Sequence, residues 1–225
     1  VVSHNEVHDC SYSAINYGGT GNVIEDNLLY DCMKVLHDGA AIYMFAATNC
    51  ILRRNFARDI TDTGGYGASA YYLDERSTGC VVENNLSLRV CWPAHNHMAT
   101  NNVIRNNVFI ADGDAKLTFP RSTGYTLERN VLYATGKIRI EGVNAVTNWS
   151  RNLFFTGANK VEGVPLKGYS AAAVNAGAPG DTLLADPQFV DWPNGDYRFR
   201  TDSHAPALGI QPIDVSQAGV SPARR

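Results

Sequence analysis

Long apolar runs are missing from this sequence of 225 residues, and none approaches the ~18 residues that a membrane-spanning helix needs. Basic clusters are missing as well: no run of Lys and Arg exceeds two, and the formal net charge is −3. Charged residues make up only 18% of the chain, a fraction too low for a disordered protein. We therefore expect no membrane and no nucleic acid as a partner.

Paired cysteines of the metal-binding or redox type are also absent. The five cysteines contain no C-x-x-C motif, and their odd number argues against a complete disulfide framework. The N-terminus shows no charged segment followed by an apolar one, so any export signal would lie outside this chain. The chain is instead rich in glycine, with 20 residues, and has nine prolines, more than a helical bundle tolerates.

A short block that ends in asparagine recurs along the chain. Examples are VIEDN at 23–27, ILRRN at 51–55 and VVENN at 81–85. The last residues of the blocks, which we call the anchor asparagines, are Asn5, Asn27, Asn55, Asn85, Asn107, Asn130 and Asn152. Their spacings are 22, 28, 30, 22, 23 and 22 residues, so a period of about 22 is interrupted twice by extra residues.

The blocks alternate in polarity, as short strands with one buried face do. The third residue before each anchor is apolar: Val2, Ile24, Leu52, Val82, Ile104, Leu127 and Trp149. A coil of about 22 residues has room for three short strands, and stacked coils would pair at ~4.8 Å. The anchors would then form an internal amide ladder, because a buried amide needs such partners. We predict an all-β right-handed parallel β-helix, taking the handedness from the general rule for parallel crossovers.

The cysteines follow the same period. Cys10 and Cys32 each lie five residues after an anchor, and Cys50 and Cys80 each lie five residues before one. Stacking would bring the members of each pair close enough for a disulfide on distance alone. The interpretation that we favour is that these cysteines fill a column of the core as small apolar residues.

The repeat fades after residue 155, so we divide the chain into coils at 1–157 and a turn-rich C-terminal region at 158–225 that caps or packs on them. Seven of the nine prolines fall from Pro165 onward, and the segment 186–214 predicts one or two short strands around an Asn-Gly turn. The first block begins at Val1 with no cap before it. We therefore expect that preceding coils are missing or that the chain self-associates through this end.

We expect the functional site where the period is broken, because a regular stack of coils has a uniform surface without a distinct binding site. The two enlarged coils are neighbours, and they contain Asp38 and Asp74. Carboxylates supply the acid, base or nucleophile for glycosidic cleavage, and aromatic rings stack on the apolar faces of sugars. If both segments were fully extended, the two carboxyls would lie too far apart to act on the same glycosidic bond. Joint action therefore requires the chain to bend at Gly39, a conformation that glycine tolerates.

Three segments of these coils align as strands: AINYG at 14–18, AIYMF at 41–45 and AYYLD at 70–74. Their alternation turns Tyr43 and Tyr72 outward, which predicts an exposed aromatic surface with the carboxylate of Asp74 at its edge. Glu75 would point to the opposite face if the strand continues, so we expect it to support the site. The residues predicted to contact the substrate are Tyr43, Tyr72, His95, His97, Glu75 and Arg121.

The next coils add basic residues. His95 and His97 alternate, so they point the same way and suit substrate contact or proton transfer, although a solvated surface pair is the alternative. Lys116 and Arg121 would bind an acidic sugar, or else are simply solvated. Pairs of aspartates at 59 and 62, or at 112 and 114, would offer oxygens to calcium, but acidic residues are common at turns. We expect no metal and no cofactor, with calcium as the alternative.

Several segments carry a likeness to known proteins: DGAAIY at 38–43, GYGASAYYLDERSTGCVVENN at 65–85, HNHMATNNVIRNNVFI at 95–110, GYTLERNVLYATG at 124–136 and the ending at 186–214. In these the chain resembles bacterial right-handed parallel β-helix proteins, including glycoside hydrolases of the α-L-fucosidase-like type. The resemblance implies that Asp38 and Asp74 form the catalytic pair, and that the protein is secreted or periplasmic. Arg76 stands where the group often has glycine; this cation would keep Asp74 ionised as nucleophile or base and leave Asp38 as the acid.

Three functions stay open at this point. The first is hydrolysis of a plant, algal or microbial glycan by Asp38 and Asp74. The second is a polysaccharide lyase, in which Lys116, His95 or His97 abstracts the proton beside a uronate carboxylate. The third is a glycan-binding or structural solenoid without catalysis. The expected partner for the hydrolase or the lyase is an oligo- or polysaccharide.

Overall fold

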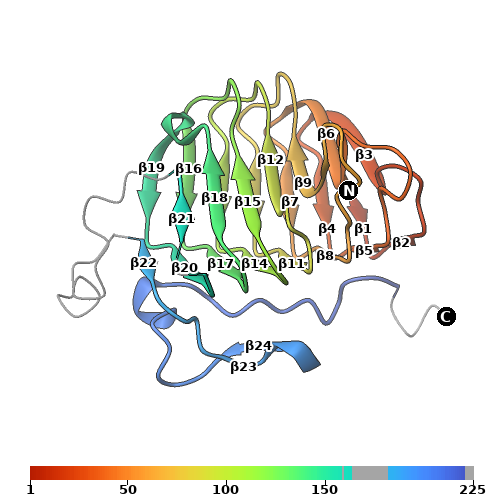
Figure 1. Ribbon diagram of the computed structural model, residues 1–225. Coiled ribbons are helices and arrows are strands. Elements are labelled where there is room, and N and C mark those ends of the chain that lie inside the picture. The colour runs from red at the N-terminus through yellow and green to blue at the C-terminus, as the bar shows by residue number, and fades with distance from the viewer. Residues whose placement is uncertain (159, 164–181, 221–225) are drawn as a thin grey trace.

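The computed structural model describes residues 1–158, 160–163 and 182–220. In this part the chain is all-β, and it visits three long parallel sheets in turn (Figure 1). Each strand of these three sheets pairs in parallel with the strand of the same sheet in the neighbouring coil. The arrangement is consistent with the predicted parallel β-helix solenoid. None of the helices in the described ranges is long and apolar enough to cross a membrane.

The three sheets follow one another around each coil. Sheet 1 contains β1 (Val2–Ser3), β4 (Val23–Glu25), β7 (Ile51–Arg53), β10 (Val81–Glu83), β13 (Val103–Arg105), β16 (Tyr125–Glu128) and β19 (Val146–Ser150). Sheet 2 contains β2 (Glu6–His8), β5 (Leu28–Tyr30), β8 (Phe56–Arg58), β11 (Leu86–Leu88), β14 (Val108–Ala111), β17 (Val131–Ala134), β20 (Leu153–Thr156) and β22 (Leu183–Leu184). Sheet 3 contains β3 (Ile15–Thr20), β6 (Gly39–Thr48), β9 (Ala68–Leu73), β12 (Ala94–Asn96), β15 (Ala115–Thr118), β18 (Ile138–Glu141) and β21 (Val161–Glu162).

The anchor asparagines form the predicted amide ladder at the corner between sheets 1 and 2. From Asn5 to Asn130, each side-chain amide donates to the Oδ1 atom of the next anchor, at distances of 2.8–3.0 Å. The same Oδ1 atoms also accept backbone N–H groups; for example, the Asn55 N–H donates to Asn85 Oδ1 at 2.9 Å. Asn85 itself is fully buried, so these bonds replace the water that its amide has lost. These bonds confirm the internal amide ladder that the spacing of the anchor asparagines predicts.

The apolar positions of the repeat build the core between the sheets. The residues three before the inner anchors are at most 1% exposed: Ile24, Leu52, Val82, Ile104 and Leu127. All five cysteines are free thiols, and Cys32, Cys50 and Cys80 are buried in the same core. This confirms the core-filling interpretation for these three residues.

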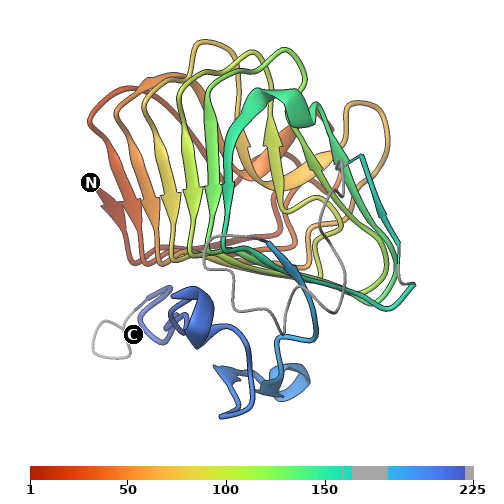
Figure 2. The same ribbon diagram turned by 90° about the vertical axis from the view of Figure 1, so that its left-hand side faces the viewer.

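The C-terminal segment covers the outer face of sheet 2 (Figure 2). Leu208, Ile210 and Ile213 pack there in one apolar cluster with Leu88 and Val108. Three short 3-10 helices are described: η1 (Val143–Ala145), η2 (Trp192–Asn194) and η3 (Pro206–Leu208). The predicted hairpin is confirmed, because β23 (Phe189–Asp191) and β24 (Asp196–Phe199) pair antiparallel around Gly195, whose φ is 89°. The division of the chain at 157/158 stays a prediction, and residues 159, 164–181 and 221–225 of its second part lie outside the described ranges.

The extra residues of the enlarged coils lie at one corner of the molecule. They form the connections 31–38, between β5 and β6, and 59–67, between β8 and β9. The corresponding connection between β14 and β15 has only residues 112–114. Both long connections therefore flank the start of the sheet 3 strands β6 and β9, on the wall whose outer face carries the site described next.

Candidate active site

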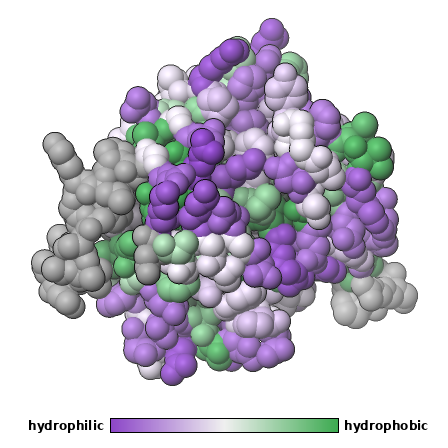
Figure 3. Space-filling view, in the orientation of Figure 1, coloured by the Kyte–Doolittle hydropathy of each residue, from purple (hydrophilic) through white to green (hydrophobic). Residues whose placement is uncertain are grey.

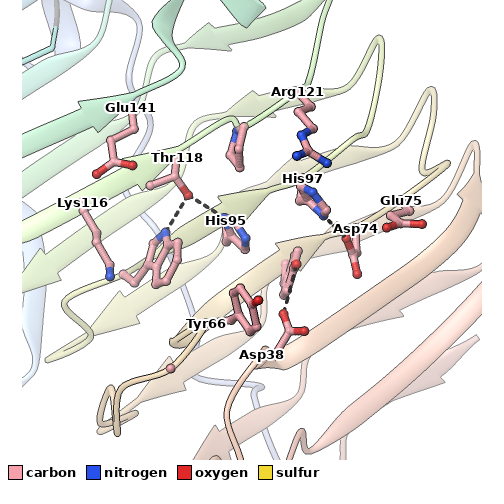
Figure 4. Close-up of a pocket in the computed structure, with 14 residues that line it drawn as sticks. Asp38, Tyr66, Asp74, Glu75, His95, His97, Lys116, Thr118, Arg121 and Glu141 are labelled. Carbon is pink, nitrogen blue, oxygen red and sulfur yellow. Dashed lines mark hydrogen bonds and ion pairs between the residues drawn. The ribbon is translucent and has the colours of Figure 1, made fainter.

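A cleft of about 730 Å³ opens on the outer face of sheet 3. Figure 3 shows this side of the molecule, where hydrophilic residues surround a smaller apolar area. Seven of the eight residues predicted from the sequence line the cleft: Asp38, Tyr72, Asp74, Glu75, His95, His97 and Arg121 (Figure 4). The eighth, Tyr43, does not line it but bonds to one of the residues that do. The structure therefore gathers the predicted residues in one place.

The register of sheet 3 brings these residues together. Neighbouring coils pair Asn16 with Tyr43, Tyr43 with Tyr72, Tyr72 with His95, His95 with Thr118 and Thr118 with Glu141. One outward column of polar and aromatic side chains thus runs across the sheet. The inward column beside it contains Ile42 and Tyr71, which are fully buried. This confirms the strand alignment predicted from the sequence.

Asp38 reaches the cleft through a bend, but the predicted position of that bend is wrong. Gly39 is already the first residue of β6, and Asp38 itself takes the left-handed conformation, with φ 62°. Aspartate tolerates this region better than most residues. The Asp38 N–H donates to the Gly67 carbonyl at 2.8 Å, and the Tyr12 hydroxyl donates to the Asp38 carbonyl at 2.7 Å. Two neighbouring connections thus hold the backbone while the residue stays exposed.

Asp74 lies deeper, directly after β9, and is only 8% exposed. The Tyr43 hydroxyl donates to its Oδ2 at 2.6 Å, and His97 Nδ1 lies 2.9 Å from its Oδ1. Burial and the bond to this carboxylate raise the pKa of Tyr43, so its hydroxyl keeps the proton that it donates. Each oxygen of the Asp74 carboxylate therefore has a hydrogen-bonding partner that fixes its position.

Tyr72 lies between the two acids. Its hydroxyl is 3.4 Å from Asp38 Oδ1, and the carboxylates of Asp74 and Asp38 add to the effect of burial in raising its pKa. The predicted exposed aromatic surface is wrong at this residue, since Tyr72 is only 3% exposed. The ring is covered by its neighbours in the outward column: Tyr43 meets it edge-on at 5.0 Å, and the His95 ring lies 4.2 Å away, between ring centroids. Tyr72 thus offers the cleft mainly its polar end.

Glu75 faces the cleft, contrary to the prediction that it points to the opposite face. Strand β9 ends at Leu73 and the chain turns immediately, so the alternation of a strand no longer applies. Asp74, Glu75 and His97 offer ligand atoms within 4.8 Å of one another, a group that is able to hold a metal ion. It is the one such group of three or more found in the described ranges.

The other charged candidates differ in their partners. Lys116 Nζ lies 3.2 Å from Asp62 and 3.6 Å from the centre of the Trp92 ring, so it is already engaged. Arg121 lines the cleft, is exposed, and has no side-chain partner among residues 1–158, 160–163 and 182–220. Asp59, one of the aspartates considered for calcium, lies 2.9 Å from Arg89. In the described part of the chain, none of these aspartates belongs to a group of three or more possible metal ligands.

Sequence reasoning missed Trp92, Thr118, Tyr66 and Glu141, which also line the cleft. Thr118 follows His95 by 23 residues and Glu141 follows Thr118 by 23, the same interval that separates Asn107 from Asn130. Extending the strand alignment by two coils would therefore have found both. No comparable interval in the sequence identifies Trp92 as a residue of the cleft. Its ring fills the space beside Gly67, where φ is 83° and a Cβ atom would collide with the ring.

Comparisons of the chain with protein-family models, with curated proteins and with solved structures returned no match. Four carboxylates line the cleft, and two of them, Asp38 and Asp74, differ in exposure. Tyr43 and His97 are partners of the more buried Asp74, and the cleft also has an arginine without a side-chain partner among the described residues. Such a set is able to bind a polyhydroxylated ligand and to move a proton to or from it.

Proposed function

We propose that this chain is a glycoside hydrolase built on a right-handed parallel β-helix, as its resemblance to α-L-fucosidase-like enzymes implies, and that it acts outside the cytoplasm. The observation that carries the proposal is that Asp38 and Asp74 line one cleft with the Tyr72 hydroxyl between them. Glycosidases need two carboxyl groups on either side of the scissile bond, in different protonation states. The substrate is an oligo- or polysaccharide.

The environments of the two acids assign their roles in this proposal. Asp74 is the nucleophile or base, because Tyr43 donates to one of its oxygens and His97 lies beside the other. Asp38 is the general acid: it is exposed, and its one side-chain partner among the described residues, Tyr72, is 3.4 Å away. In the bond-breaking step, Asp38 gives its proton to the leaving oxygen while Asp74 attacks the sugar or activates a water.

The proposal is tested by digestion of a substrate panel with product analysis. The panel contains 4-nitrophenyl glycosides of fucose, galactose, glucose, xylose, rhamnose and arabinose in both anomers, together with pectin, xylan and alginate. Release of 4-nitrophenol or of reducing sugars supports hydrolysis. An unsaturated product that absorbs in the ultraviolet would replace it with a lyase, and binding without any product would replace it with a non-catalytic glycan binder. Activity that a chelator removes and a divalent cation restores would make Asp74, Glu75 and His97 a metal site instead.

Replacement of Asp38 with asparagine tests the role of the acid. We expect cleavage of natural oligosaccharides to fall by about 10²-fold, because the leaving oxygen no longer receives a proton. Cleavage of 4-nitrophenyl glycosides should fall much less, since 4-nitrophenolate leaves without protonation. Initial rates on both substrate types measure the difference. Equal losses on both would remove Asp38 from the role of acid.

Replacement of Tyr43 with phenylalanine tests the support of Asp74. The change removes the 2.6 Å hydrogen bond to Oδ2, and bonds to a charged group are stronger than neutral ones. We expect kcat/KM to fall about tenfold or more, because Asp74 loses the donor that fixes its position in the cleft. Tyr30→Phe, the same change on sheet 2, is the control and should leave activity unchanged. A wild-type kcat/KM in a folded Tyr43→Phe protein would contradict the prediction.

A further inference from the structure

The His95 ring is held in the middle of the outward column of sheet 3. The residue is 8% exposed, and its ring lies 4.2 Å from Tyr72 and 4.4 Å from Trp92, between centroids. His97 lies beyond it in nearly parallel orientation, at 6.3 Å. Rings on several sides leave the imidazole little freedom to turn. The two nitrogens of His95 therefore have separate surroundings, one toward Thr118 and the other toward the cleft (Figure 4).

The Thr118 hydroxyl bonds to two rings at once. Trp92 Nε1 lies 3.0 Å from Thr118 Oγ1, and an indole nitrogen can only donate, so the oxygen accepts this bond. His95 Nδ1 lies 2.5 Å from the same oxygen. Thr118 is only 3% exposed, so water has little access to its hydroxyl as an alternative hydrogen-bond partner. The direction of the second bond depends on where the single hydroxyl proton goes.

Two assignments of that proton are possible, and they differ in their cost. If His95 Nδ1 carried a proton and donated it, Thr118 Oγ1 would accept twice and its own O–H would need another acceptor. Among the described residues the Thr118 O–H has no acceptor other than His95 Nδ1. If Thr118 instead donates to an unprotonated Nδ1, every donor in the group is satisfied. The geometry therefore favours an imidazole whose proton is on Nε2.

The Nε2 atom has no hydrogen-bond partner among the described residues. It is also not among their fully buried side-chain atoms that lack a partner, so it is accessible to solvent. Because His95 lines the cleft, its Nε2–H is available to a bound molecule. Because its unprotonated Nδ1 accepts from Thr118, the ring carries a single proton, and the Nε2–H is a donor of fixed direction.

We propose that Trp92 and Thr118 hold His95 as the Nε2–H tautomer, and that this N–H donates a hydrogen bond to an oxygen of the sugar in the cleft. The inference rests on the proposed function for the identity of the ligand and extends it to the group that is recognised. The recognised group is a hydrogen-bond acceptor of the sugar, namely a hydroxyl oxygen, the ring oxygen or a carboxylate oxygen. Thr118 is a positioning residue that acts through His95, and His95 transfers no proton itself.

The tautomer is tested without any ligand by nitrogen–proton correlation NMR of the protein with ¹⁵N-labelled histidine. We expect one His95 signal set, with the proton on Nε2 and with Nδ1 shifted as a nitrogen that accepts a hydrogen bond. In Thr118→Val, which keeps the side-chain shape, Nδ1 should move to the position of a nitrogen without a donor. Thr118→Ser, which keeps the hydroxyl, should restore it. A proton on Nδ1 in the wild type, or an unchanged Nδ1 in Thr118→Val, overturns the inference even if the protein hydrolyses glycosides.

Donation to the sugar is tested with the 4-nitrophenyl glycosides of the panel, added to Asp74→Asn so that they are bound but not consumed. We expect one of them to shift the Nε2–H signal of His95. In an otherwise wild-type chain, Thr118→Val should raise KM about tenfold with little change in kcat, and Thr118→Ser should restore it. Absence of a shift with every glycoside overturns the donation, whatever the tautomer. Circular dichroism of each variant establishes that the fold is intact.

Discussion

Replacement of Asp74 with asparagine is expected to abolish glycoside cleavage, lowering kcat/KM by about 10³-fold or more. Asparagine has the size of aspartate and still accepts the Tyr43 hydrogen bond, but it carries no charge to attack a sugar or activate water. The loss should be equal for natural oligosaccharides and for 4-nitrophenyl glycosides, because this role does not depend on the leaving group. That pattern separates Asp74 from Asp38, whose replacement should spare the activated substrates.

The measurement is a comparison of initial rates for the wild type, Asp74→Asn and Asp202→Asn. Asp202 is exposed and lies outside the cleft, so the same change there should leave the rate unaltered. Circular dichroism and the thermal midpoint show whether the fold is kept. Azide added to Asp74→Ala then separates the two roles: formation of a glycosyl azide identifies a nucleophile. Retention of more than a tenth of wild-type kcat/KM in a folded Asp74→Asn protein would refute the proposed mechanism.

Replacement of Asn85 with alanine should lower the free energy of unfolding by about 3 kcal/mol or more. Asn85 donates to the Leu52 carbonyl and to Asn107 Oδ1, both at 3.0 Å. It also accepts the Asn55 backbone N–H at 2.9 Å and the Asn55 side-chain amide at 3.0 Å. Alanine removes all four bonds and leaves buried donors and acceptors of the neighbouring coils without partners, which is more costly than the bonds themselves.

Urea unfolding followed by circular dichroism measures this effect. The matched control is Asn148→Ala, the same change at an exposed residue of β19, which should stay within about 0.5 kcal/mol of the wild type. Because the ladder runs through every coil from Asn5 to Asn152, a gap in its middle should weaken the contact between the coils on either side. Equal stability of the two variants would show that the amide ladder contributes nothing to folding.

Part of the candidate site was readable from the sequence because it repeats with the coils. The alignment of Tyr43 with Tyr72 followed from alternation, and the structure pairs these residues as expected. The same rule failed for Glu75, since alternation holds only within a strand and β9 ends two residues earlier. The predicted position of the bend near Asp38 was also wrong, because that bend depends on a hydrogen bond from Tyr12 and on one to the Gly67 carbonyl, both in neighbouring connections. Local patterns do not contain such contacts.

By itself, the sequence determined the coil period, the inward and outward columns of the sheets and the asparagine ladder. These features repeat at short intervals, so hydrophobic alternation and the needs of a buried amide are enough to predict them. Only the tertiary structure decided which polar atoms meet in the cleft: Tyr43 with Asp74, and Thr118 with both Trp92 and His95. Those pairings depend on how separate coils stack and where their connections turn, because a hydrogen bond exists only when both partners are brought within about 3 Å.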